Sequence, residues 1–77
     1  MKAYILITIQ TGEIPEALRQ LREVKGLNCA DMTFGPYDAI AVVEAKDLNT
    51  LGWVVAHAIQ PVVGVIDTLT CPVIEGV

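Results

Sequence analysis

The sequence has few basic residues, and they are scattered. Five Lys and Arg residues stand against nine Asp and Glu, which gives a formal net charge of −4 and an isoelectric point of about 4.6. Nucleic-acid binding requires Lys and Arg to be clustered so that they can contact phosphates together. The sequence therefore predicts no direct binding to DNA.

Long apolar runs, cysteines and glycine clusters are also scarce. No segment approaches the ~18 uninterrupted apolar residues of a membrane helix, and no small-residue cleavage site follows the apolar stretch at residues 3–9. Cys29 and Cys71 are too few for a disulfide framework, and with His57 they lack the spacing of a zinc site. No phosphate-binding glycine loop is present. We expect a cytoplasmic protein that contacts no membrane, has reduced thiols, and binds no metal or cofactor.

Candidate catalytic groups are equally scarce. His57 is the only histidine, and it follows Trp53 by four residues, so the two share one face of an expected helix. A catalytic histidine needs an orienting partner or a nearby nucleophile, and the spacing suggests neither. We expect no enzymatic activity, and we assign His57 to the surface or to an interface. Trp53 lies outside the apolar stripe of its helix and is predicted to make an oligomer contact.

Apolar residues, in contrast, are abundant for such a short chain. Of the 77 residues, 53% are hydrophobic, and the mean hydropathy is +0.54. Residues 1–77 are long enough for one domain only, and a chain of this size buries only about 60% of its unfolded surface. Some of the apolar surface is therefore expected to face a second copy of the chain.

Hydrophobic periodicity and turn residues predict six elements in the order βαββαβ. This order is typical of the ferredoxin-like α+β fold, with two helices on one face of a four-stranded antiparallel sheet whose central strands are the first and the third. The expected strands are residues 3–9, 27–34, 39–45 and 64–74, and the expected helices run from Pro15 to Lys25–Gly26 and from an N-cap at Asp47 or Asn49 to Gln60. Their buried stripes are expected to be Ile14, Leu18, Leu21 and Val24, then Leu48, Leu51, Val55 and Ile59.

The face of the sheet without helices is also expected to be apolar. Alternation along the central strands places four apolar side chains on it: Tyr4, Leu6, Ile40 and Val42. A half-solvated antiparallel sheet normally presents polar residues there. Strand spacing and rise give this face an area of about 300 Å², and apolar patches of that size mark interfaces. The sequence thus predicts a dimeric αβ sandwich in which two sheets pack face to face.

Two short motifs carry a family resemblance. Gly35-x-x-Asp38 precedes an apolar strand, and Gly64-Val65-x-x-Thr68-x-Thr70 lies on the last strand. Together with the element order, they make nearly the whole chain resemble the effector-binding half of the Lrp/AsnC transcriptional regulators, the RAM domain. The resemblance implies homodimers that assemble into octamers or decamers and bind amino acids between dimers. Full family members also have an N-terminal helix-turn-helix. Because the chain starts at Met1 directly in the first strand, the resemblance implies a stand-alone module.

The resemblance also implies a set of ligand-binding residues. A zwitterionic amino acid needs an acceptor for its ammonium group and several N–H or O–H donors for its carboxylate. Pro36 suits the second position of a turn but removes one donor, and Tyr37 either fills the pocket or forms its wall. Asp38 has an alternative role in stabilising the turn. The implied set is Gly35, Pro36, Tyr37, Asp38, Thr68 and Thr70.

Two other functions are compatible with this fold. Small dimeric ferredoxin-like proteins include oxygenases and isomerases, and such an enzyme would need His57 or Tyr37 to face an internal pocket. A structural assembly protein would need no ligand. A regulatory module, in turn, has two routes of action: co-assembly with full-length Lrp/AsnC regulators, or contact with another partner.

Overall fold

The order of the elements along the chain agrees with the sequence pattern. The computed structural model describes residues 1–77. Its elements are β1 (Lys2–Ile9), α1 (Ile14–Leu21), β2 (Leu27–Met32), β3 (Ala39–Glu44), α2 (Leu48–Val54), the π-helix η1 (Val55–Ile59) and β4 (Val65–Pro72).

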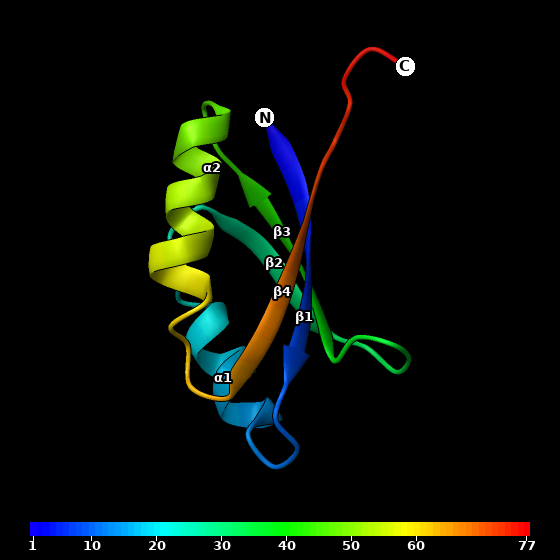
Figure 1. The fold of residues 1–77 in the computed structure, drawn as a ribbon, viewed down its shortest axis with the longest axis vertical. Coiled ribbons are helices and arrows are strands. Elements are labelled where there is room, and N and C mark those ends of the chain that lie inside the picture. Colours follow the sequence, from blue (N-terminus) through cyan, green and yellow to red (C-terminus); the bar gives the residue numbers. More distant parts are fainter.

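The four strands form one antiparallel sheet in the order β2-β3-β1-β4. The first and third strands are therefore central, as predicted, and the second and fourth are the edges. Both helices cover one face of the sheet, and no element covers the other face (Figure 1). The protein is thus a two-layer α+β domain with the ferredoxin-like arrangement.

The core lies between the helices and the covered face of the sheet. Five large side chains in this core are at most 1% exposed: Ile5 and Ile7 of β1, Leu21 of α1, Leu51 of α2 and Ile59 of η1. On β3, Ile5 and Ile7 pair with Ala41 and Ala39, whose small side chains leave room for the helices to approach the sheet. No charged or polar residue is fully buried, so apolar burial accounts for the cohesion of the two layers.

The first helix is shorter than predicted. It ends at Leu21, and residues beyond it make tight turns in which Val24 N donates to Leu21 O at 3.0 Å. The extension to Lys25–Gly26 was wrong because the chain must reverse before β2, and Arg22 fixes this reversal by donating from Nε to Ala30 O at 3.0 Å.

The second helix, which consists of α2 continued by η1, begins and ends close to the predicted residues. Asp47 is the N-cap, and its side chain accepts from Thr50 N at 2.7 Å. Hydrogen bonding from the Thr50 side chain and then from its backbone N–H lowers the pKa of Asp47. The prediction for Leu48 was wrong: it is 61% exposed. As the first residue of the helix, Leu48 lines an outer hollow between α2 and β4 and does not reach the core.

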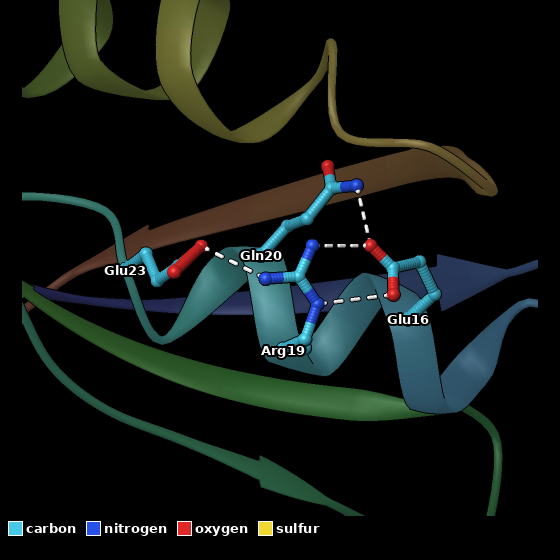
Figure 2. A network of polar contacts seen from close by, with 4 residues as sticks. All are labelled: Glu16, Arg19, Gln20 and Glu23. Atoms are coloured by element: carbon cyan, nitrogen blue, oxygen red, sulfur yellow. Dashed lines mark hydrogen bonds and ion pairs between the residues drawn. The ribbon is translucent and has the colours of Figure 1, made fainter.

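Polar side chains on the outer face of α1 form a small network (Figure 2). Arg19 donates to both carboxylate oxygens of Glu16, at 3.0 Å and 2.6 Å, and Gln20 donates to the same carboxylate at 2.9 Å. Arg19 also reaches Glu23 at 3.3 Å. The hydrogen bonds from Arg19 and then from Gln20 lower the pKa of Glu16 from its ordinary 4.5 to about 2.

We predict that Glu16 makes stability depend on pH in the acid range. Because its pKa is lower in the folded state, its stabilisation is complete above pH 4.5 and is lost as the pH falls towards 2. Glu16→Gln should therefore lower the urea midpoint at pH 7, and the two proteins should converge near pH 2. A difference between their midpoints that stays constant over this range would contradict the assignment.

Candidate functional site

The sheet face that carries no helix, called here the open face, has an apolar centre. Register places Tyr4 opposite Val42 and Leu6 opposite Ile40, while the alternate residues of both strands are buried under the helices. Tyr4 is 41% exposed and the other three are half-buried in a single chain. The four predicted interface residues therefore lie together on the open face. The sequence pattern did not indicate Leu69, which pairs with Leu6 from β4 and is 50% exposed.

The two ends of the open face are polar. At one end Lys2 pairs with Glu44, and the Lys2 ammonium lies 5.2 Å from the centre of the Tyr4 ring. At the other end Thr8 pairs with Asp67. An apolar centre with a charged rim is the usual composition of a protein–protein interface.

The loop between β2 and β3 is longer than the predicted four-residue turn. Strand β2 ends at Met32, and Thr33 closes the loop by donating from its N to Asp38 O at 3.0 Å and from Oγ1 to Tyr37 O at 2.7 Å. The expected strand ending at residue 34 was wrong, because these bonds replace strand pairing beyond Met32. Figure 1 shows that the loop projects beyond the sheet on the side away from the helices.

Asp38 ties the end of this loop to the central strand. Its N donates to Ile7 O at 2.9 Å, and its Oδ2 accepts from Ile9 N at 2.7 Å. These bonds extend the pairing of β3 with β1 past its last register pair, Ile7 with Ala39. The side chain thus has a structural role, and its second oxygen, Oδ1, remains to accept a bond from a ligand.

A hollow of about 490 Å³ lies beside the loop. Gly35 and Asp38 line it, whereas Pro36 and Tyr37 do not. The sequence pattern does not indicate its other residues, because it places Phe34 in a strand and Ile14 in the core of the helix layer. They are Ile14, Met32, Thr33 and Phe34.

Thr68 and Thr70 lie elsewhere. They pair with Ile7 and Ile5, so they share the helix-covered face at the outer edge of β4. Thr68 Oγ1 accepts from Gln60 Nε2 at 3.1 Å, and Thr70 lines a second hollow of about 320 Å³ between β4 and α2. No hollow of a single chain includes both the loop residues and these threonines.

Trp53 and His57 stack on the outer face of the second helix. Their ring centroids are 4.6 Å apart with an interplanar angle of 17°, and His57 Nδ1 lies 3.1 Å from Trp53 O. Trp53 is 61% exposed. His57 lines none of the hollows. This pair therefore offers a flat aromatic surface pointing away from the sheet.

Two further properties bear on the class of protein. No three His, Cys, Asp or Glu side chains are grouped so that they could hold a metal ion. No helix has the length and apolar character needed to cross a bilayer.

The fold is a small two-layer α+β domain, and the comparison with protein families gives its class. Residues 2–77 match the Lrp/AsnC ligand binding domain. The chain belongs to this family. No curated protein sequence matches it.

Solved structures with the same fold include TTHA0845 from Thermus thermophilus. That structure is 26% identical, with a TM-score of 0.92, and the alignment covers 99% of this chain and 95% of the other. AsnC from E. coli is 22% identical, with a TM-score of 0.85, over 99% of this chain and 55% of AsnC. The regulator NMB0573 from Neisseria meningitidis, solved as an L-Met complex, is 17% identical, with a TM-score of 0.87. The alignment covers 99% of this chain and 51% of the regulator. The last two similarities show the fold alone.

Proposed function

We propose that this protein is a regulatory module that binds an amino acid and changes its assembly in response. The family and the fold establish a ligand-binding domain.

The first step is a dimer formed by two open faces. Tyr4, Leu6, Ile40 and Val42 provide an apolar centre that a single chain leaves partly exposed. Apolar patches of this kind mark interfaces, and burying several hundred Å² of them contributes roughly 10 kcal/mol before association costs, at ~25 cal/mol per Å².

The observation that carries the ligand proposal is the division of the candidate residues between two hollows. Gly35 and Asp38 lie beside one, and Thr70 beside another, on the far edge of the sheet. A site that uses both sets needs two chains. Because the proposed dimer joins the open faces while Thr68 and Thr70 lie on the helix-covered face, we assign the second chain to another dimer. In line with the family resemblance, the proposed assembly is an octamer or a decamer, with Trp53 at a contact between dimers.

The loop hollow has the chemistry that an amino acid requires. Asp38 Oδ1 accepts a hydrogen bond from the ammonium group, and threonine hydroxyls and loop N–H groups donate to the carboxylate. Ile14, Met32 and Phe34 provide an apolar wall for the ligand's side chain. The L-Met complex of the Neisseria meningitidis regulator makes L-Met the first ligand to test.

Regulation follows from assembly. Without clustered basic residues the module does not bind DNA itself, and it acts in the cytoplasm on full-length Lrp/AsnC regulators by co-assembly, or on another partner. A ligand that contacts two dimers favours the assembled state by its differential affinity.

A thermal-shift screen of the twenty amino acids tests this function. A ligand at a hundred times its Kd stabilises the folded state by about 2.7 kcal/mol, which raises the Tm by about 10 °C or more in a domain of this size. N-acetylation removes the ammonium charge, so the N-acetylated form of the best amino acid should give no shift. If none of the twenty raises the Tm, the protein is a ligand-free assembly module.

A further inference from the structure

The outer face of the second helix carries no charged residue. Residues 48–66 contain no Asp, Glu, Lys or Arg, and they include all of α2 and η1. Leu48 and Trp53 are each 61% exposed on this helix. The outer face of α1, in contrast, presents the polar network of Figure 2. A solvated helix face normally carries charged side chains, whereas the centre of an interface is depleted of charge and enriched in aromatic residues. The second helix therefore has the composition of a contact surface.

A hollow of about 320 Å³ between α2 and β4 adjoins this surface, and it is called here the α2–β4 hollow. Leu48, Leu51 and Val55 line its helix side, and Thr70 lines its strand side. The hollow is on the helix-covered side of the sheet. Because the proposed dimer joins the open faces, that side remains outward, and an occupant from another copy of the chain must come from another dimer.

The loop between β2 and β3 presents an exposed aromatic side chain. Phe34 is 108% exposed, and it does not line the α2–β4 hollow of its own chain. The loop is held by the hydrogen bonds of Thr33 to Tyr37 O and Asp38 O, and by those of Asp38 to β1. A loop that is already ordered loses little conformational freedom when it binds. Phe34 is thus a preorganised apolar group on a projecting loop (Figure 1).

The charged residues that flank the loop and the hollow are complementary. Asp31 and Asp38 stand on either side of the loop, and neither forms an ion pair. Lys46 and Asp47 are the only charged residues within two sequence positions of the hollow's lining residues. The Asp47 carboxylate accepts from Thr50 N at 2.7 Å, whereas Lys46 forms no ion pair. Complementary charges select the partner at an interface, so these flanks favour the loop of a second copy as the occupant.

We propose that Phe34 of one dimer inserts into the α2–β4 hollow of a neighbouring dimer. This inference rests on the proposed assembly of dimers, and it names the contact that completes the ligand site. Phe34 lines the loop hollow together with Gly35 and Asp38, so its insertion brings these residues beside Thr70 of the neighbouring dimer. An apolar group that fits a pocket elsewhere on the same chain makes head-to-tail contacts, which close into a ring when the rotation permits.

Two variants, Phe34→Asp and Gly52→Arg, test the two halves of this contact. Gly52 lines the hollow, and an added Cβ there meets no atom within 4 Å, so an arginine fits on the helix and obstructs the hollow. Sedimentation velocity over a protein-concentration series, with and without a mixture of the twenty amino acids, measures assembly. Each variant should remain a dimer where the wild type assembles, because loss of a buried aromatic anchor weakens a contact about 30-fold or more.

A mixture of the two variants should assemble again. The Gly52→Arg dimer keeps Phe34, and the Phe34→Asp dimer keeps an open hollow, so one inserts into the other. Val77→Asp is the matched control, because Val77 is also 108% exposed but lies at the opposite end of the molecule from the loop (Figure 1). This variant should assemble as the wild type does. Circular dichroism confirms folding, and Phe34→Ser or Gly52→Gln replaces a variant that misfolds.

The outcomes separate failure of the insertion from failure of the assembly. A wild type that assembles, together with either variant that assembles equally, overturns the insertion but not the proposed function. A mixture of the two variants that stays dimeric also overturns it, since it shows that Phe34 and the hollow do not meet. A folded Phe34→Asp monomer would place the loop inside the dimer interface and would likewise contradict the insertion. A wild type that is dimeric under every condition overturns the proposed assembly and the insertion with it.

Discussion

Leu6→Asp is expected to dissociate the dimer or unfold the chain. Leu6 lies in the middle of the open face, between Ile40 on β3 and Leu69 on β4. In the proposed dimer, the new carboxylate would be surrounded by apolar side chains of both chains, with no cation in its row.

The expected loss of dimer stability is large because the two-fold axis places the substitution in the interface twice, once from each chain. Each Leu6 loses about 1.5–3 kcal/mol of burial, and an unpaired charge in a dry interface adds several kcal/mol. Two copies therefore cost at least about 6 kcal/mol, or roughly a 10⁴-fold increase in the dissociation constant at 1.4 kcal/mol per tenfold. Sedimentation velocity measures the dissociation, and circular dichroism measures the folded fraction.

Leu48→Asp is the matched control. It makes the same substitution at an exposed leucine in the helix layer, where an acidic residue in the first turn also suits the helix dipole. This variant should remain a folded dimer. If Leu6→Asp sediments as the wild type does, the open face is not the dimer interface.

Asp38→Ala and Asp38→Asn are expected to differ in Tm. This difference separates the structural role of Asp38 from its role in ligand recognition. Alanine removes the acceptor of Ile9 N, and leaving that donor unsatisfied costs about 1–3 kcal/mol, or about 4–8 °C of Tm for each kcal/mol. Asparagine keeps a carbonyl oxygen for Ile9 N but removes the negative charge, so its Tm should stay close to that of the wild type.

Both variants should lose amino-acid affinity. A hydrogen bond to a charged group contributes about 1.5–3 kcal/mol, which corresponds to about a 10- to 100-fold weaker Kd. Calorimetry on Asp38→Asn is decisive because the fold is retained. Glu75→Gln, which removes one negative charge from the exposed C-terminal segment, should bind as the wild type does. Wild-type affinity in Asp38→Asn would leave Asp38 with only its hydrogen bond to β1.

The fold could be predicted from the sequence because each element has a strong local signal. These signals are the alternation in β1 and β3, the apolar spacings of four and three residues that end at Leu18 and Leu21, and the N-cap at Asp47. Each of them acts over a few residues. Together, these signals are compatible with only a few fold topologies. The helix end at Leu21 and the exposure of Leu48 depend instead on where β2 and β4 lie, which local patterns do not contain.

The candidate site was less predictable because it depends on register and loop geometry. The sequence indicates that Thr68 and Thr70 share a face, but only their pairing with Ile7 and Ile5 shows that this is the helix-covered one. The bond from Asp38 to Ile9 N joins residues 29 positions apart, and the π-helical turn at Val55–Ile59 leaves no sequence signature.

Sedimentation velocity in reducing buffer, with and without the amino acid that gives the largest thermal shift, tests ligand-dependent assembly most directly. We expect a dimer without ligand at micromolar concentration and a shift to octamers or decamers as the ligand saturates. Asp38→Asn should remain dimeric at the same ligand concentration. A folded monomer, or a saturated protein whose size distribution is the same as without ligand, would contradict ligand-dependent assembly.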